Sequence, residues 1–202
     1  MKCALIGPTY PFRGGIAHYT TLLCHHLRKR HEVTFISFRR QYPAWLFPGR
    51  TDRDPSQQPL EVECQRLIDP FKPWTWVQAA RRIREMAPEL LLLQWWVPFW
   101  APIWLSIIWL VRRQANPRIV FVCHNVIPHE ARRVDQLLVR WVLEKGDGII
   151  VHSQRDRRDL IQLVPEGNVR VTALPTFEFF AQETPLAGEA RFKLGLDVDI
   201  PI

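Results

Sequence analysis

The sequence has little cysteine, and none of it is arranged to bind a metal. Only four of the 202 residues are cysteines, and no C-x-x-C pair or cysteine–histidine spacing typical of a zinc site occurs. Cys3 and Cys123 lie in apolar runs, where a free thiol behaves as a small hydrophobic side chain. The pattern predicts a reduced, cytosolic protein without a metal. We also expect no secretory signal, because the first apolar run stops at Gly7-Pro8.

The glycine patterns of several common enzyme classes are missing. The dinucleotide fingerprint G-x-G-x-x-G, the P-loop and the hydrolase motif G-x-S-x-G are all absent. Ser153 is therefore expected to cap a helix and not to act as a nucleophile. The second predicted strand ends in Arg39-Arg40 without an acidic residue for a ribose, which disfavours an NAD dehydrogenase. Arg39 and Arg40 are expected to form a solvated loop.

Acidic residues are outnumbered by basic ones, 20 against 27, which gives a net charge of +7. Such a charge suits phosphates, nucleic acid or an anionic membrane, and it equally serves solubility alone. No helix-turn-helix, RNP or zinc-finger pattern is present. We therefore expect no nucleic-acid partner.

The tryptophan-rich run 95–111 is slightly short for a membrane-spanning helix, and prolines interrupt its first half. Arg112-Arg113 follows it at once, as at a membrane interface. We predict that residues 103–111 form a core helix packed on a sheet. Residues 95–100, including Trp96, are a candidate surface for a lipid or an acceptor, which would give peripheral membrane contact.

The chain alternates apolar runs with helical patterns. Strands are predicted at 3–6, 33–38, 60–67, 90–95, 119–123, 148–151 and 169–174. Helices are predicted at 16–29, 75–86, 100–113, 133–144 and 154–163. Strands separated by helices of this length predict an α/β fold with a Rossmann-like parallel sheet sandwiched by helices. Ligands are then expected at the carboxyl ends of the strands.

A glycine-bearing loop follows the first predicted strand and precedes the first predicted helix. Gly14 and Gly15 let the backbone approach a ligand closely, and amides at a helix N-terminus bind anions. Arg13 adds a planar donor for phosphate or carboxylate, and Tyr10 belongs to the same loop. We predict that these four residues bind substrate. The plain alternative is a tight strand-to-helix turn.

A second candidate site follows the strand predicted at 119–123. His124, Asn125, His129 and Glu130 come after this strand, where open α/β sheets bind ligands. An imidazole there can act as a general base or donate a hydrogen bond to a substrate. We predict His124 as the catalytic residue and Asn125 and His129 as substrate-binding residues. In the structural alternative, His124 caps the strand and Glu130 begins the next helix.

Taken together, these segments resemble the N-terminal domain of a GT-B glycosyltransferase of the retaining family 4 (group 1). The resemblance spans essentially the whole chain and depends on the order and spacing of its motifs. The motifs are Gly7-Pro8 through Gly14-Gly15-Ile16-Ala17, His31-Glu32-Val33, His124-Asn125 with Pro128-His129-Glu130, and residues 146–153.

The resemblance implies two Rossmann-like domains facing each other across a cleft, with this chain as the N-terminal half of a GT-B fold. In that family, the N-terminal domain binds the acceptor, and the C-terminal domain holds most of the nucleotide-sugar donor. The resemblance places Gly14-Gly15 against the donor diphosphate or the acceptor, and His124 against the transferred sugar. It implies retention, no essential metal, and a glycan or lipid-linked acceptor.

The C-terminal residues resemble the entry into a second domain. We expect an acceptor-side domain over residues 1–185, and a linker with the start of a donor-binding domain over residues 186–202. The family's E-x7-E donor motif is absent from the chain, so we expect the chain alone to be inactive. The alternative is an acceptor- or membrane-surface-binding module without catalysis, located in the cytoplasm or at the inner face of a membrane.

Overall fold

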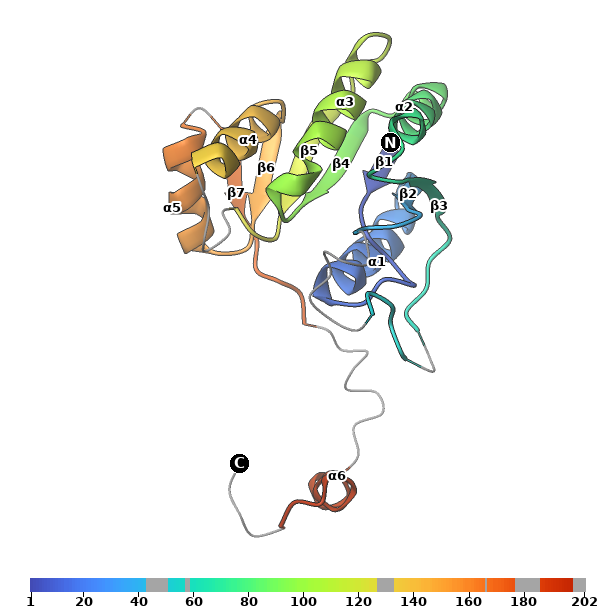
Figure 1. Cartoon of the computed structure of the whole chain (residues 1–202), viewed down its shortest axis with the longest axis vertical. Coiled ribbons are helices and arrows are strands. Elements are labelled where there is room, and N and C mark those ends of the chain that lie inside the picture. Colours follow the sequence, from blue (N-terminus) through green and yellow to red (C-terminus); the bar gives the residue numbers. More distant parts are fainter. Residues whose placement is uncertain (43–50, 57–58, 127–132, 166, 177–185, 198–202) are drawn as a thin grey trace.

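A computed structural model describes residues 1–42, 51–56, 59–126, 133–165, 167–176 and 186–197. Its centre is a sheet of seven parallel strands in the order β3-β2-β1-β4-β5-β6-β7 (Figure 1). The strand order reverses between β1 and β4, and open α/β sheets bind ligands at such a switch point. The strands are β1 (Lys2–Ile6), β2 (Glu32–Phe38), β3 (Gln65–Ile68), β4 (Leu90–Trp95), β5 (Arg118–Cys123), β6 (Gly148–Val151) and β7 (Val169–Val171).

Helices cover both faces of this sheet. The helices are α1 (Gly15–Arg28), α2 (Pro73–Met86), the 3-10 helix η1 (Pro98–Trp100), α3 (Ala101–Arg112), α4 (Arg133–Leu143), α5 (Gln154–Leu163) and α6 (Ala187–Leu194). On one face, Cys24 of α1 packs with Leu5, Phe35 and Leu92. On the other face, buried residues of α2, α3, α4 and α5 join the larger apolar cluster of the sheet. The predicted sandwich of helices and a parallel sheet is confirmed.

Local sequence explains where several helices begin and end. Pro73 lies in the first turn of α2, where its missing N–H leaves no helical hydrogen bond unmade. The helix ends at Ala87, which has a left-handed backbone with φ 46°. Ser153 caps α5, because its Oγ accepts a hydrogen bond from the Asp156 amide at 3.0 Å. The capping role predicted for Ser153 is therefore confirmed.

The predicted order of strands and helices is confirmed, with clearly shifted bounds for two strands and one additional helix. β3 begins at Gln65, later than predicted, and β7 ends at Val171 instead of residue 174. The sequence did not predict α6, which buries none of its residues. Most of the predicted connection at 178–188 lies outside the described residues. The domain boundary after residue 185 stays a prediction.

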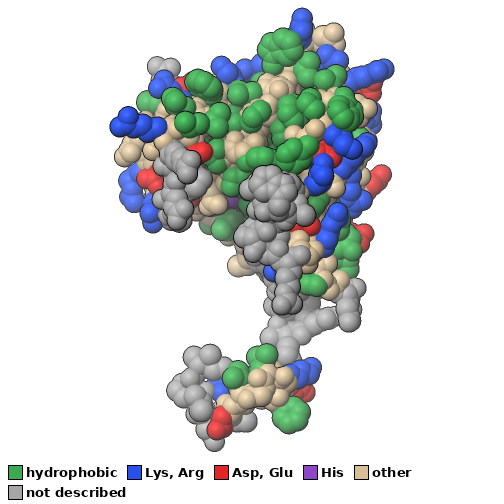
Figure 2. All heavy atoms as spheres, in the orientation of Figure 1, with side chains coloured by type: hydrophobic (Ala, Val, Ile, Leu, Met, Phe, Trp, Pro, Cys, Tyr) green, Lys and Arg blue, Asp and Glu red, His purple; other side chains and the backbone are tan. Residues whose placement is uncertain are grey.

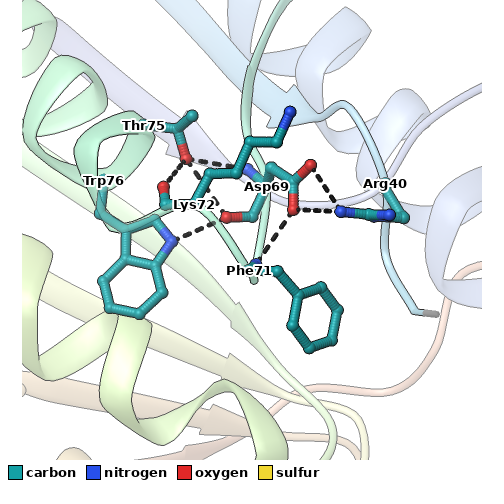
Figure 3. Close-up of polar contacts among 6 residues, drawn as sticks. All are labelled: Arg40, Asp69, Phe71, Lys72, Thr75 and Trp76. Carbon is teal, nitrogen blue, oxygen red and sulfur yellow. Dashed lines mark hydrogen bonds and ion pairs between the residues drawn. The ribbon is translucent and has the colours of Figure 1, made fainter.

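A polar network around Asp69 fixes the turn from β3 into α2 (Figure 3). Arg40 Nη2 donates to both carboxylate oxygens of Asp69 at 2.9 Å, and the Phe71 amide donates to one of them at 3.0 Å. The Asp69 carbonyl accepts a hydrogen bond from Trp76 Nε1 at 2.9 Å. Burial raises the pKa of Asp69, but the hydrogen bonds from Arg40 and Phe71 outweigh it and lower the pKa below its ordinary value.

Arg39 and Arg40 lie in an exposed loop after β2, as expected, and their side chains also make contacts within the sheet edge. Arg39 Nε donates to the Arg66 carbonyl at 3.1 Å, while Arg40 pairs with Asp69. Both side chains therefore tie the end of β2 to β3. Their contacts are structural, because each guanidinium has a partner within this edge of the sheet.

Candidate functional site

The candidate site lies at the carboxyl ends of β1, β4, β5 and β6, where the turn from β1 into α1 meets neighbouring strands. Thr21 Oγ1 donates to the Ala17 carbonyl at 2.8 Å, so Thr9 Oγ1 is the donor in its 2.6 Å hydrogen bond to Thr21. A Cβ at Gly7 would lie 2.5 Å from Gln94 Cγ, which is closer than packing allows. Glycine at this position therefore lets β1 and β4 approach each other closely.

The turn presents backbone amides at the N-terminus of α1. Gly14 caps this helix with φ 111°, a conformation that favours glycine. The first backbone hydrogen bond of the helix runs from His18 N to Gly14 O at 3.2 Å, so the amides of residues 15–17 have no helical carbonyl as partner. The first turn holds no acidic residue and no side-chain cap. Together with the exposed Arg13, it forms a site with donors for an anion.

A pocket of about 240 Å³ opens beside this turn. Its lining residues are Pro8, Arg13, Gly14, Gly15, Ile16, Ala17, Gln41, Tyr42 and Trp96. Trp96 is only 6% exposed, and its Nε1 donates to the Tyr42 hydroxyl at 2.6 Å, which fixes the indole as a wall of the pocket. The structure thus brings together four predicted substrate-binding residues: Arg13, Gly14, Gly15 and Trp96.

Three rings gather next to the same turn. The ring centroid of Tyr19 on α1 lies 4.8 Å from that of His124 and 5.2 Å from that of His152. The two histidine centroids are 5.2 Å apart. The sheet register explains this meeting, because Cys123 pairs with Val151 and each histidine is the first residue after its strand.

His124 is held as a neutral ring with a defined proton. Its Nε2 lies 2.7 Å from Gln94 Oε1, and because that oxygen only accepts, the Nε2–H is the donor. Burial, with a smaller contribution from His152, lowers the pKa of His124 from 6.5 to about 3. At neutral pH the Nδ1 atom therefore carries a lone pair, and the ring offers a hydrogen-bond acceptor.

The remaining predicted site residues are placed differently. Asn125 follows His124 and is exposed at the end of β5. Tyr10 is partly exposed, does not line the 240 Å³ pocket, and uses its carbonyl to accept a hydrogen bond from Arg66 Nη2 at 2.8 Å. His129 lies outside the described residues.

The prediction that the aromatic residues of 95–100 form an exposed surface is wrong for its three tryptophans. Trp95 and Trp100 are fully buried, and Trp96 shows only its pocket edge. The ring centroids of Trp100 and Trp104 lie 5.9 Å apart in a stacked arrangement inside the core. Tryptophans in this run therefore serve packing, as predicted for residues 103–111, with the exception of Trp109, which is 59% exposed.

Sequence analysis missed three residues of the site: Gln94, Tyr19 and His152. Gln94 was visible as a polar residue in the apolar run of β4, and the structure buries it completely. His152 follows a strand in the same way as His124, but only the pairing of β5 with β6 makes the two neighbours. No sequence signal singles out Tyr19 among the residues of its helix.

His152 has a defined proton position as well. Its Nδ1 lies 3.1 Å from the Thr172 carbonyl, and because a carbonyl only accepts, Nδ1–H is the donor. Among the described residues, its buried Nε2 has no hydrogen-bond partner. The described residues contain no group of three or more histidine, cysteine or acidic side chains placed to hold a metal ion. They also include no helix long and apolar enough to cross a bilayer.

Comparison with known proteins gives one family and many related structures. The sequence model described as Glycosyltransferase Family 4 matches residues 13–175. No curated protein sequence matches the chain. Fifty-nine chains of solved structures match it.

Three of these structures illustrate the likeness. Anabaena Alr3699/HepE, solved with UDP and glucose, has a TM-score of 0.60 at 15% identity, over 96% of this chain and 50% of its own. An alpha-glucosyltransferase solved with UDP and DNA has a TM-score of 0.60 at 13% identity, over 91% and 45%. UDP-N-acetylglucosamine 2-epimerase from Rickettsia bellii has a TM-score of 0.59 at 15% identity, over 98% and 52%. The chain thus shares their fold and spans about half of their length.

Proposed function

The chain belongs to glycosyltransferase family 4, and from this premise we propose that it forms the acceptor-side part of an enzyme that transfers a sugar from a nucleotide-sugar donor. One observation supports placing sugar transfer at the carboxyl edge of the sheet. A neutral histidine, His124, stands at the carboxyl edge of the sheet, beside the turn that leads into the free amides of α1. UDP or a UDP-sugar is the first donor to test, because HepE and the alpha-glucosyltransferase were solved with UDP.

The N-terminus of α1 is proposed to bind the anionic part of a substrate. Its amides and the exposed Arg13 donate hydrogen bonds, and the helix dipole favours negative charge there. Gly14 and Gly15 have no atom within 4 Å of the position of an added Cβ, so a ligand can approach their backbone. A diphosphate or a phosphorylated acceptor fits these donors.

His124 is proposed to contact the transferred sugar. Its Nε2–H is held by Gln94, so the Nδ1 lone pair is the atom that can accept a hydrogen bond from a sugar hydroxyl. During transfer, the bond from the anomeric carbon to the diphosphate oxygen breaks, and a bond to the acceptor oxygen forms. The acceptor loses its proton, and the nucleoside diphosphate leaves. We propose that the configuration at the anomeric carbon is retained and that no metal is essential.

The donor is proposed to bind mostly outside this chain, and turnover by the 202 residues alone is not expected. The test compares the purified chain with the polypeptide obtained by extending it through the coding sequence beyond codon 202. Both are incubated with UDP-glucose and other nucleotide sugars, and release of the nucleoside diphosphate is measured. The proposal expects release only from the extended polypeptide. Turnover by the 202 residues alone would contradict the proposal that the donor binds mostly outside this chain. A stop codon after residue 202 would favour a donor-binding partner chain or a binding role without catalysis.

The acceptor is proposed to be a glycan or a lipid-linked molecule on the cytoplasmic side of a membrane. A second candidate function is an acceptor- or membrane-surface-binding module without catalysis. The tryptophans predicted to form its surface, Trp95, Trp96 and Trp100, are buried, so any membrane contact through tryptophan must use other residues. The exposed tryptophans on α2, α3 and α4 support this second candidate.

A further inference from the structure

Three tryptophans are more than half exposed, and all three lie on helices of the same layer. Trp74 on α2 is 60% exposed, Trp109 on α3 is 59% exposed, and Trp141 on α4 is 54% exposed. The same helices expose further apolar residues: Val77, Val134 and Leu137. Figure 2 shows hydrophobic side chains gathered over the part of the molecule that these helices occupy in Figure 1. Apolar surface of this extent marks an interaction site.

The helical spacing on α4 shows that this exposure is not incidental. Val134, Leu137 and Trp141 recur at intervals of three and four residues, so they form one stripe along the helix. The buried residues of α4, Val139, Val142 and Leu143, lie on its other side. The helix therefore carries an apolar stripe on its exposed side, next to the exposed Arg133, Gln136 and Arg140, whereas a fully solvated surface helix would be polar there.

A groove lies between α2 and α3 on this layer, with a volume of about 940 Å³. Most of the side chains that line it are apolar, and cations lie at one end. The lining includes Trp76, Val77, Leu105, Ile108, Trp109 and Leu110, with Arg112, Arg113 and Lys145 as the cations. The exposed Val77 and Trp109 face solvent next to an apolar floor.

Cations accompany the exposed tryptophans. The Arg113 guanidinium lies 4.6 Å from the Trp109 ring centroid, and Lys72 Nζ lies 6.0 Å from that of Trp74. Residues 101–113 contain no acidic side chain. An aromatic ring next to a long basic side chain is typical of protein surfaces at the headgroup level of a bilayer.

We propose that the layer of α2, α3 and α4 docks on an anionic lipid bilayer. Trp74, Trp109 and Trp141 enter the headgroup region, while Arg113 and Lys145 contact lipid phosphates. A second copy of this chain fits less well, because both copies would bring the same cations, Arg113 and Lys145, to the contact. The net charge of +7 also opposes self-association and favours an anionic surface.

Docking through α2, α3 and α4 leaves the proposed sugar-transfer site accessible. The argument for docking does not depend on the proposed function. Arg112, at the C-terminus of α3, lies 3.7 Å from Asp147, whose carboxylate accepts a hydrogen bond from the Ile119 amide at the start of β5. The basic end of the groove is therefore at the amino edge of the sheet. His124 lies at the carboxyl edge, on the opposite side.

The test is co-sedimentation of the chain with vesicles. Vesicles of phosphatidylcholine alone are compared with vesicles containing about 30% phosphatidylglycerol, at low and at high salt. We expect binding to the anionic vesicles that weakens as salt rises. Arg113→Gln with Lys145→Gln should weaken it about 30-fold, since each basic residue near such a surface contributes about fivefold. The matched control, Lys29→Gln with Arg30→Gln, removes the same charge at the end of α1 on the other face and should have little effect.

The aromatic part is tested with Trp109→Ser and Trp141→Ser, which replace exposed rings and should leave the melting temperature nearly unchanged. Their combination should weaken binding at least tenfold. Absence of sedimentation with every vesicle would overturn the proposal, and so would equal binding by all variants. Light scattering that shows a dimer lost in Trp109→Ser, without vesicle binding, would assign the face to a second copy. If a serine variant fails to fold, the comparison of the two charge variants still decides.

Discussion

Acidification should destabilise this chain through His124. The pKa of His124 in the folded chain is lowered to about 3, while an unfolded histidine keeps an ordinary value near 6.5. Between these values, the unfolded state binds more protons at this position than the folded state does. Stability from this group is therefore fully present above about pH 6.5 and is lost progressively as the pH falls toward about 3.

The magnitude follows from the difference between the two pKa values. From about pH 7 to about pH 5, the loss for a fully shielded ring is about 2 kcal/mol. The ring is partly exposed, and solvent screening reduces the expected loss to about 1 kcal/mol. Urea unfolding followed by tryptophan fluorescence at several pH values measures the free energy of unfolding directly.

The control is His124→Gln, which cannot take up a proton in this range. We expect its free energy of unfolding to fall less steeply between about pH 7 and about pH 5, by about 1 kcal/mol relative to the natural chain. The difference between the two slopes removes the contributions of all other groups. Parallel slopes would refute the conclusion that His124 is held neutral by burial and Gln94.

Three further substitutions test the packing around the site and the sheet edge. Gly7→Ala should destabilise the chain by about 1–3 kcal/mol in urea unfolding, because the added Cβ meets Gln94 Cγ at 2.5 Å, while Gly15→Ala should change stability by less than about 0.5 kcal/mol. Tyr42→Phe removes the acceptor of Trp96 Nε1 and should cost about 1–3 kcal/mol in the same assay. Asp69→Asn should lower the melting temperature by several degrees, because it removes the charge that pairs with Arg40.

Each of these substitutions has an outcome that contradicts its reasoning. Equal stability of the two glycine variants would mean that β1 and β4 relax around an added methyl group. An unchanged free energy for Tyr42→Phe would mean that the indole N–H finds another acceptor. An unchanged melting temperature for Asp69→Asn would mean that backbone contacts alone hold the β3-to-α2 turn.

The fold was accessible from sequence because its signals are local. Apolar runs such as residues 90–95 and helical spacing such as that of residues 103–111 each depend on neighbours within a few turns. Capping by Ser153 is equally local. The family resemblance and the α/β sandwich were therefore predicted, and both are confirmed by the match over residues 13–175 and by the sheet topology.

The site was accessible only in part because it depends on contacts between distant segments. The glycine turn with Arg13 is one continuous stretch of sequence, but only the structure shows that Trp96 lines the same pocket. The grouping of His124 with His152 depends on strand pairing, which local patterns do not encode.

Sequence analysis also did not predict which side chains of a helix face the core and which face solvent. Composition marked residues 95–111 as aromatic and apolar, but only the structure separates the buried Trp95 from the exposed Trp109. The spacing of Trp109 from Ile107 and Val111 predicts its exposure once those two residues are known to be buried, since residues two positions apart face different sides of a helix.

The most direct test of the account is to measure nucleoside diphosphate release from UDP-sugars by the extended polypeptide carrying either His124→Ala or His26→Ala. His26 is exposed on α1 and is the matched control. The account predicts that His124→Ala lowers the rate by roughly a hundredfold or more, while His26→Ala leaves it unchanged. Equal rates for the two variants would contradict the assignment of the sugar-transfer site to the carboxyl edge of this sheet.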